Sequence, residues 1–302
     1  MNAAVLPAGP GKRAAWKMAV RIPTLTAAVA PVLIGSGVAI HDDVFSALPA
    51  LAALLGALCL QVGANFANDV FDFQRGTDTV DRLGPPRATQ MGLLSPNEML
   101  LGMSAMFALA TAFGVFLAFE SGWPIVVAGL ASIVAAIVYT GGPWPTGYHA
   151  LGDVFTFVFF GPVAVVGTYF VQAGETSNLA WLASIPVGCT VTMILVVNNL
   201  RDIPTDRHTN KRTLAVLLGD RGTRVWFYAL ALVAFGVPVV ATIAGASSFG
   251  FVAVVAGAYW LWKPLRAVVN GVHGRELNPI LKATARFNLA FGVAWAISLA
   301  LG

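Results

Sequence analysis

Apolar stretches of about 20 residues recur along the whole 302-residue chain and limit what it can fold into. Hydrophobic residues make up 57% of the sequence and charged residues only 11%, whereas about a quarter of a soluble protein is charged. A water-facing fold with one very apolar core is the alternative, but it does not explain why stretches long enough to cross a bilayer repeat from end to end. We therefore predict an all-α integral membrane protein.

The apolar stretches predict about nine transmembrane helices in one domain, residues 21–302, after an N-terminal tail, residues 1–20. Basic residues before the first span resemble the start of a signal peptide. The apolar run continues through Pro31 to Ile40, so we expect an uncleaved anchor. The predicted spans cover residues 22–40, 46–67, 97–119, 123–140, 153–173, 179–200, 225–244, 247–265 and 283–301.

The basic residues predict the orientation of the chain in the membrane. With a cytoplasmic N-terminus and alternating spans, every one of the 18 Lys and Arg residues falls in a cytoplasmic segment or at the adjoining end of a span. The opposite loops hold acidic residues alone: Asp42, Asp43, Glu120 and Glu175. This pattern follows the positive-inside rule. We expect a bacterial inner (plasma) membrane protein with a cytoplasmic N-terminus and its polar loops, about residues 68–96 and 201–224, on the cytoplasmic side.

A cluster of polar residues directly follows the second span: Asn65, Asn68, Asp69, Asp72, Asp78 and Asp81. If the helix continues past Phe66, Asn68 and Asp72 share one face, and Asn65 joins them one turn earlier. Gly76 is expected to end the helix, so that Asp78 folds back toward Asp72. Because like charges this close repel, a divalent cation is expected between them, and hard oxygen ligands suit Mg²⁺.

A second cluster repeats the same spacing after a later span. Asn198, Asp202 and Asp206 are each four residues apart, and the two clusters lie about 130 residues from one another, which hints at an internal duplication. We expect Pro204 to interrupt the helix, leaving a looser geometry beyond Asp202. Acidic residues at helix ends are commonly only solvated, but two matched clusters after two spans favour a functional site.

Basic residues surround both clusters and suit a diphosphate ligand. Magnesium bridges carboxylate to phosphate, while Arg and Lys bind the remaining oxygens. The alternative is that these residues are topology signals and lipid-headgroup contacts. The candidates are Arg75, Arg82, Arg87, Arg201, Arg207, Lys211 and Arg212.

A third segment, Tyr139–Pro162, is rich in Gly, Pro and aromatic residues and carries one acid, Asp153. It is either a tight turn between spans or a pocket wall in which Tyr139, Trp144 and Tyr148 face a flat substrate or a carbocation. Asp153 is a candidate for the group that takes a proton from the substrate.

The paired clusters resemble the UbiA superfamily of intramembrane aromatic prenyltransferases. The matching motifs are Asn68-x-x-x-Asp72-x-x-x-Gly76-x-Asp78 and Asn198-x-x-x-Asp202-x-x-x-Asp206. Many members have an acid where this chain has Gly76; Gly76 followed by Asp78 is similar to the menaquinone-pathway branch. The stretches "GTDTVDRLGPPRATQMGLLSP", "YTGGPWP" and "NNLRDIPTDRHTNKRTLAVLLG" also resemble that branch, and the resemblance runs from about Arg21 to the C-terminus.

The resemblance implies nine helices around a central cavity with a cytoplasmic Asp-rich cap. It implies Mg²⁺-dependent transfer of a polyprenyl group from polyprenyl diphosphate to 1,4-dihydroxy-2-naphthoate, with loss of CO₂ and diphosphate, giving demethylmenaquinone. The resemblance assigns metal binding and catalysis to residues of the two motifs: Asn68, Asp72, Asp78, Asn198, Asp202 and Asp206. Substrate-binding candidates are Arg87, Lys211, Arg212, Tyr139, Asp153 and Asn65. Asp69 is assigned no role, and Asp81 is expected to hold its loop through Arg82 or Arg87.

Two other functions are weighed beside this one. Another superfamily member would act on homogentisate, 4-hydroxybenzoate or a tetrapyrrole; the Gly76–Asp78 variant and the "RTLAV" stretch argue against it. A transporter or channel predicts ionisable groups at the membrane midplane, whereas these acids follow spans at one face. Membrane lipid is the expected surrounding, and no nucleic-acid partner is expected.

Overall fold

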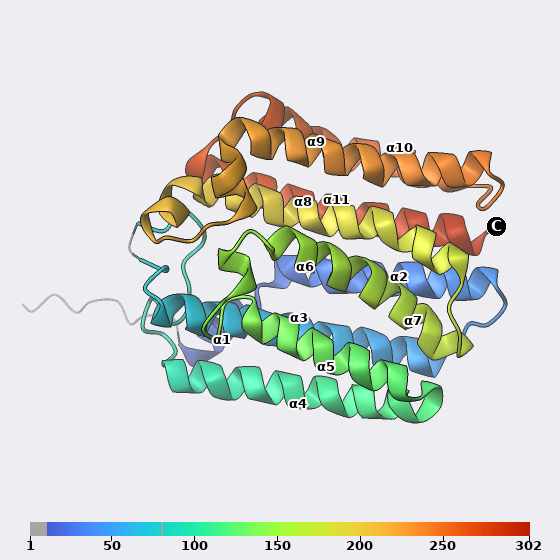
Figure 1. Ribbon diagram of the computed structural model, residues 1–302, viewed down its shortest axis with the longest axis horizontal. Coiled ribbons are helices and arrows are strands. Elements are labelled where there is room, and N and C mark those ends of the chain that lie inside the picture. The colour runs from blue at the N-terminus through green and yellow to red at the C-terminus, as the bar shows by residue number, and fades with distance from the viewer. Residues whose placement is uncertain (1–10, 80) are drawn as a thin grey trace, which may run out of the picture.

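The computed structural model describes residues 11–79 and 81–302. Within them the fold is an all-α bundle whose long helices lie roughly along one common axis (Figure 1). The long helices are α2 (Thr26–His41), α3 (Ala47–Gln74), α4 (Pro96–Ser121), α5 (Trp123–Val138), α8 (Asn178–His208), α9 (Leu214–Ile243), α10 (Gly250–Val269) and α11 (Leu277–Ala300). The ninth crossing is composite: α6 (Gly152–Val158), a π-helical turn η3 (Phe159–Val163) and α7 (Ala164–Ala173). Shorter elements are α1 (Lys12–Val20) and the 3₁₀ turns η1 (Ile22–Leu25), η2 (Thr146–Tyr148) and η4 (Gly274–Glu276).

The nine predicted spans are confirmed in number and order across the described residues. Eight helical segments are long and apolar enough to cross a membrane, and α5 is a shorter apolar helix. Large apolar side chains such as Leu101, Leu232 and Val255 are exposed on the outside of the bundle. Lipid tails rather than water can cover such a surface, so the protein is an integral membrane protein.

The predicted N-terminal tail is partly ordered. Residues 1–10 lie outside the described residues, but Lys12–Val20 form α1, whose Ala15 and Ala19 are buried. The Trp16 ring meets that of Phe66 on α3 edge-on, with centroids 5.4 Å apart. The helical bundle therefore begins before residue 21.

Small residues let α2 pack closely on two neighbours. A Cβ atom on Gly35 would lie 2.5 Å from the carbonyl oxygen of Val165 on α7, and one on Gly37 would lie 2.5 Å from that of Ala296 on α11. In a membrane the hydrophobic effect does not drive helices together, because lipid tails are as apolar as the side chains. Close approach of the backbones increases van der Waals contact, which stabilises helix association instead. The buried amide of Asn288 adds a polar link, because it accepts from Thr190 of α8 and donates to the Thr26 carbonyl oxygen of α2.

Pro162 accompanies a change in helix geometry inside the composite crossing. The π-helical turn η3 contains this proline, which has no backbone N–H to donate. Such turns are local bulges in otherwise α-helical segments. The bulge includes Phe159 and Phe160, both of which line the internal cavity described below.

The close contact between α2 and α11 predicts that Gly37→Leu lowers the thermal stability of the protein in detergent. A side chain would press on the Ala296 backbone, and overpacking of this kind costs about 1–3 kcal/mol. The matched control is Gly236→Leu on α9, where nothing lies within 4 Å of a built Cβ. Equal melting temperatures for the two variants would contradict the packing described.

Candidate active site at the polar end of the bundle

The two Asp-rich segments lie at one end of the bundle, here called the polar end: the last turns of α3 and α8 with the connections 75–95 and 209–213 (Figure 1, left). Helix α3 continues to Gln74, so Asn65, Asn68 and Asp72 share one face as predicted. Gly76 has a φ of 71° and its N–H donates to the Phe73 carbonyl oxygen at 3.0 Å, which ends the helix as expected.

Asp78 folds back toward Asp72, as the sequence predicts. The Thr77 backbone N–H and hydroxyl both donate to the Asp72 carbonyl oxygen, at 3.0 and 2.9 Å. Arg87 bridges the two acids: its Nη2 lies 3.5 Å from Asp72 Oδ2 and its Nε 3.3 Å from Asp78 Oδ2. Asp78 also pairs with Arg82.

This arrangement leaves hydrogen-bonding capacity unused inside the protein. Asp78 Oδ2 and Arg87 Nε and Nη1 are buried and have no hydrogen-bond partner among the described residues, since the Nε–Oδ2 contact lacks hydrogen-bond geometry. Burial raises the pKa of Asp78 to about 6, although the Arg82 charge lowers it. An unsatisfied buried donor or acceptor costs about 1–3 kcal/mol, so these atoms favour a polar ligand.

Asp69 orders the connection between α3 and α4. Its two carboxylate oxygens accept from the backbone N–H groups of Ala88 and Thr89, at 3.3 and 3.1 Å. The expectation that Asp81 holds this loop through Arg82 or Arg87 is wrong: both guanidinium groups pair with Asp78, and Asp81 is exposed. Asp69 can do this because it projects from a helix toward two free N–H groups.

The second cluster lies on one continuous helix. The expected interruption at Pro204 is wrong, because α8 runs through this proline to His208. Hydrogen bonds on either side of Pro204 maintain the helical turns. The Thr205 hydroxyl donates to the Asp202 carbonyl oxygen at 3.0 Å, and the Thr209 backbone N–H donates to the Thr205 carbonyl oxygen at 3.1 Å. Asn198, Asp202 and Asp206 therefore keep their four-residue spacing on one face.

Arg201 fixes the second cluster in place. Only 1% exposed, it donates to both carboxylate oxygens of Asp202, at 2.8 and 2.6 Å, and to Asn198 Oδ1 at 2.8 Å. It also donates to Asn278 Oδ1 at 2.9 Å, and Asn278 in turn donates to the Leu83 carbonyl oxygen at 3.0 Å. One guanidinium thus links α8, α11 and the α3–α4 connection.

Lys211 lies between the two clusters. Its Nζ sits 5.0 Å from the ring centre of Tyr148, whose hydroxyl donates to Asp72 Oδ1 at 2.7 Å. Burial alone would lower the pKa of Lys211, but the carboxylates of Asp72, Asp206, Asp202 and Asp78 raise it. The ammonium therefore stays charged and within electrostatic reach of both clusters.

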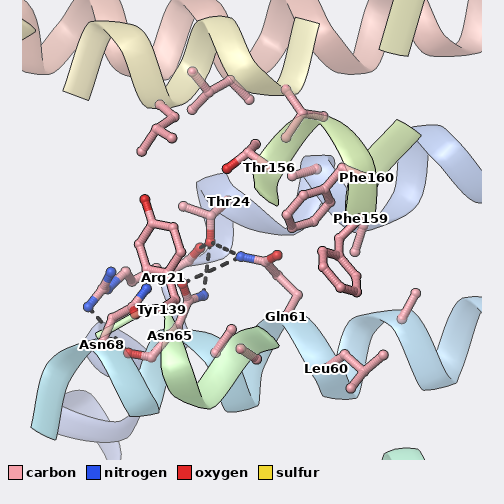
Figure 2. A pocket seen from close by; sticks show the side chains of 18 of the residues that line it. Arg21, Thr24, Leu60, Gln61, Asn65, Asn68, Tyr139, Thr156, Phe159 and Phe160 are labelled. Carbon is pink, nitrogen blue, oxygen red and sulfur yellow. Dashed lines mark hydrogen bonds between the residues drawn. The ribbon is translucent and has the colours of Figure 1, made fainter. Parts of the chain in front are cut away.

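A cavity of about 850 Å³ leads from the polar end into the bundle. Figure 2 shows Arg21, Asn65, Asn68 and Tyr139 at one side of the view and Leu60, Phe159 and Phe160 at the other. Seven of the predicted site residues line it: Asn65, Asn68, Asp72, Arg87, Tyr139, Asn198 and Lys211. The cavity therefore joins a charged mouth to an apolar interior.

Five predicted site residues lie outside the cavity lining: Asp78, Asp153, Asp202, Asp206 and Arg212. Asp78 contacts Arg87 of the lining, and Asp202 accepts from Asn198 of the lining at 3.4 Å. The Asp206 carbonyl oxygen accepts from the backbone N–H of Lys211, another lining residue, at 2.9 Å. Asp153 is buried and accepts from the Trp226 indole at 3.0 Å. The Arg212 side chain is exposed, and its backbone N–H donates to the Tyr148 carbonyl oxygen at 3.1 Å.

The aromatic segment is both a turn and a pocket wall. Tyr139 lines the cavity, and the Tyr148 hydroxyl bonds Asp72. Trp144 does not face the cavity as considered above: it is 54% exposed and stacks on His149 with ring centroids 4.2 Å apart.

Several polar cavity residues escaped the sequence analysis, among them Arg21, Thr24 and Gln61. Arg21 ends α1 with a φ of 53°, and its guanidinium donates to the Asn65 carbonyl oxygen at 3.3 Å. Gln61 Nε2 donates to the Thr24 hydroxyl at 3.4 Å, and Gln61 Oε1 is buried with no hydrogen-bond partner in the described part of the chain. A glutamine inside an apolar span is the sequence signal that could have found this group.

No ready-made metal cage of three or more His, Cys, Asp or Glu side chains occurs within residues 11–79 and 81–302. The donor set nevertheless fits Mg²⁺, which is usually held by one or two carboxylates together with substrate phosphates and water. The carboxylates of Asp72 and Asp78 are neighbours across Arg87, and Asp78 Oδ2 makes no hydrogen bond to any residue that the structure describes.

The fold and the cavity define an integral membrane protein able to bind an amphipathic molecule with an anionic head and an apolar tail. Residues 28–278 match the UbiA prenyltransferase family, and the chain belongs to that family. The chain is 39% identical over 291 residues to the 1,4-dihydroxy-2-naphthoate octaprenyltransferase of Mycobacterium tuberculosis, covering 96% of this chain and 98% of that one. It is 32% identical to the protein of the same name from Bacillus subtilis, covering 94% and 91%.

Solved structures show the same fold. A UbiA homolog from Aeropyrum pernix superposes with a TM-score of 0.71 at 17% identity, covering 91% of this chain and 97% of that one. A UbiA homolog from Archaeoglobus fulgidus bound to GPP and Mg²⁺ gives a TM-score of 0.68 at 15% identity, covering 95% and 99%.

The Asp69 contacts predict that Asp69→Ala loosens the α3–α4 connection. Two backbone N–H groups lose their acceptor, a cost of about 1–3 kcal/mol each if they stay buried. In limited trypsin digestion, we expect faster cleavage after Arg82 and Arg87 than in the parent protein. Asp81→Ala, which changes an exposed carboxylate in the same loop, should leave the rate unchanged. Equal cleavage of both variants would contradict the anchoring role.

Proposed function

We propose that this protein transfers a polyprenyl group from polyprenyl diphosphate to 1,4-dihydroxy-2-naphthoate, with Mg²⁺ as cofactor and demethylmenaquinol, the hydroquinone form of demethylmenaquinone, as product. The observation that carries the proposal is the buried Arg87, which lines the cavity. Within the described residues its Nε and Nη1 make no hydrogen bond, and neither does the neighbouring Asp78 Oδ2. The names of the curated relatives supply the acceptor.

The diphosphate is assigned to the polar end. Arg87 and Lys211 bind its oxygens from opposite sides, since Arg87 belongs to the α3–α4 connection and Lys211 to the α8–α9 connection. Magnesium would be held by Asn68, Asp72, Asp78, Asn198, Asp202 and Asp206 together with phosphate oxygens, and when bound it stabilises the negative charge of the leaving diphosphate. Asp202 Oδ1 accepts from Arg201 alone among the described residues and keeps a lone pair for a metal, whereas Oδ2 accepts from both Arg201 and Asn198.

The apolar part of the cavity suits the prenyl tail and the reaction it undergoes. The bond between the allylic carbon and the diphosphate oxygen breaks, and the electron pair leaves with diphosphate. Tyr139, Phe159 and Phe160 present aromatic rings that stabilise the allylic cation, and the apolar walls exclude the water that would convert it to an alcohol. The naphthoate ring carbon that bears the carboxylate attacks the cation and forms the new carbon–carbon bond. The bond from this carbon to the carboxylate then breaks, its electron pair returns to the ring, and CO₂ leaves without loss of a ring proton.

The acceptor is placed beside Tyr139 and Asn65, which line the cavity below its charged mouth. Arg212 and Asp153 are left out of this site because one is exposed and the other bonds Trp226. We further propose that residues 21–302 act as one catalytic domain, with α1 packed on it, and that the polar end faces the cytoplasm.

The assignment of the two clusters predicts magnesium-dependent activity that both clusters support. Purified protein with 1,4-dihydroxy-2-naphthoate, an allylic polyprenyl diphosphate and Mg²⁺ should yield prenylated product and CO₂ by mass spectrometry, and EDTA should abolish both. Loss of a residue that only supports a metal ligand lowers activity by up to about 100-fold. Because Asp72 and Asp202 are proposed as direct ligands, Asp72→Asn and Asp202→Asn should each lower the rate by at least that much.

The control variant is Asp81→Asn, in the same loop but exposed, which should keep the parent rate. Product from homogentisate or 4-hydroxybenzoate instead would overturn the acceptor and keep the mechanism. Inactivity with every acceptor would overturn the enzymatic proposal.

The proposed orientation predicts which cysteines a membrane-impermeant maleimide reaches on intact cells. The background carries Cys59→Ala and Cys189→Ala, and both test positions are exposed. Glu175→Cys, at the end of the bundle opposite the polar end, should react on intact cells. His208→Cys, at the polar end, should react only after the cells are opened. The reverse pattern would overturn the cytoplasmic placement of the site.

A further inference from the structure

Gln61 is the deepest polar residue that α3 contributes to the cavity lining. It lies on the same side of the helix as Asn65 and Asn68, and the α3 lining residues farther from the polar end are all apolar or glycine. Eleven residues, or about 16 Å of helix, separate Gln61 from Asp72. Gln61 therefore lies below the place assigned to the diphosphate, at a depth where another part of the substrates must be bound.

The hydrogen bonds around Gln61 determine which way its amide points. The Thr24 hydroxyl donates to the Arg21 carbonyl oxygen at 2.9 Å, so toward Gln61 it can only accept. Asn65 Nδ2 donates to the Val20 carbonyl oxygen at 2.9 Å, which leaves Asn65 Oδ1 as a second acceptor. Gln61 must therefore turn Nε2 toward both groups, at 3.4 and 3.5 Å, and Oε1 away from them.

This arrangement leaves the amide oxygen of Gln61 without a donor. Oε1 is buried and accepts no hydrogen bond from any residue that the structure describes. Figure 2 shows the amide between Thr24 on one side and the rings of Phe159 and Phe160 on the other. Both bonds to Nε2 are long, and the terminal torsion of a glutamine is soft, so a modest rotation turns Oε1 toward a donor in the cavity. A buried acceptor of this kind favours a ligand that carries an O–H group.

Another glutamine of a membrane helix shows the contrast with a purely structural role. Gln172 on α7 accepts from the Ser46 backbone N–H at 3.3 Å and donates to the Thr168 carbonyl oxygen at 2.7 Å. It does not belong to the cavity lining. Contacts within the protein thus account for both polar atoms of Gln172, whereas at Gln61 they account only for the nitrogen.

We propose that Gln61 Oε1 accepts a hydrogen bond from the 4-hydroxyl of the aromatic acceptor and so orients its ring in the cavity. The inference rests on the proposed prenyl transfer and adds the residue that recognises this hydroxyl. The 1-hydroxyl of 1,4-dihydroxy-2-naphthoate is adjacent to the carboxylate and donates to it within the molecule. The 4-hydroxyl lies on the opposite side of the ring and needs a partner from the protein. Gln61 and Asn65 are one helical turn apart, a spacing that a flat ring can bridge.

The test is calorimetric binding of two naphthoates to the purified full-length protein, with Mg²⁺ and a non-cleavable allylic thiolodiphosphate present. The parent protein should bind 1,4-dihydroxy-2-naphthoate roughly three- to tenfold more tightly than 1-hydroxy-2-naphthoate, which lacks the 4-hydroxyl. Gln61→Leu should weaken binding of the dihydroxy compound by a similar factor. It should change the affinity for the monohydroxy compound by less than about twofold, so that the preference disappears. Gln61→Met, which keeps the length of the side chain, gives the same comparison if the leucine variant fails to fold.

The control is Gln172→Leu, which should keep the parent's preference even if it lowers the melting temperature, because Gln172 lies outside the cavity lining. If Gln61→Leu keeps the preference, or weakens the binding of both naphthoates by the same factor, the hydroxyl contact is overturned and Gln61 only supports the helices. A parent protein that binds both naphthoates equally well would also overturn it. If the parent protein binds neither compound, the proposed acceptor fails, and this inference fails with it.

Discussion

The burial of opposite charges at one end of a membrane bundle is the constraint on which the rest of the structure depends. A buried charge is costly unless it is paired and hydrogen-bonded. Arg201, almost completely buried, therefore engages Asp202, Asn198 and Asn278, and Arg87 bridges Asp72 and Asp78. These contacts join segments distant in the sequence and set the positions of four of the six proposed metal ligands: Asp72, Asp78, Asn198 and Asp202. The atoms they leave unpaired define where an anionic ligand can bind.

The same constraint explains why the charged mouth opens into an apolar interior. Lipid surrounds the bundle. Among the described residues, the charged side chains of the cavity lining come from segments near the polar end, and the deeper part of the cavity lies between small and aromatic side chains. A donor with an anionic head and a long apolar tail matches both halves at once. Water is disfavoured along the apolar half, where a carbocation must survive until the ring attacks it.

Patterns that depend on periodicity and length were predictable from the sequence. Hydropathy fixes the nine crossings, and the four-residue spacing places Asn68 with Asp72 and Asn198 with Asp202 on common faces. Features that depend on tertiary partners were not. Pro204 remains inside α8 because neighbouring bonds close the flanking turns, and Asp69 rather than Asp81 anchors its loop because it projects toward free N–H groups. Arg21 lines the cavity, but its place there was not predictable because the positive-inside pattern already explained a basic residue at that position.

Calorimetric titration of the purified protein with a non-cleavable allylic thiolodiphosphate, with and without Mg²⁺, tests the central claim most directly. It reports binding of the donor's head group without requiring turnover or the correct acceptor. The account predicts binding that requires Mg²⁺ and is weakened about tenfold or more by Arg87→Met, which removes a charge-assisted contact worth about 1.5–3 kcal/mol. Equal affinity without Mg²⁺, or an unchanged affinity in Arg87→Met, would contradict it.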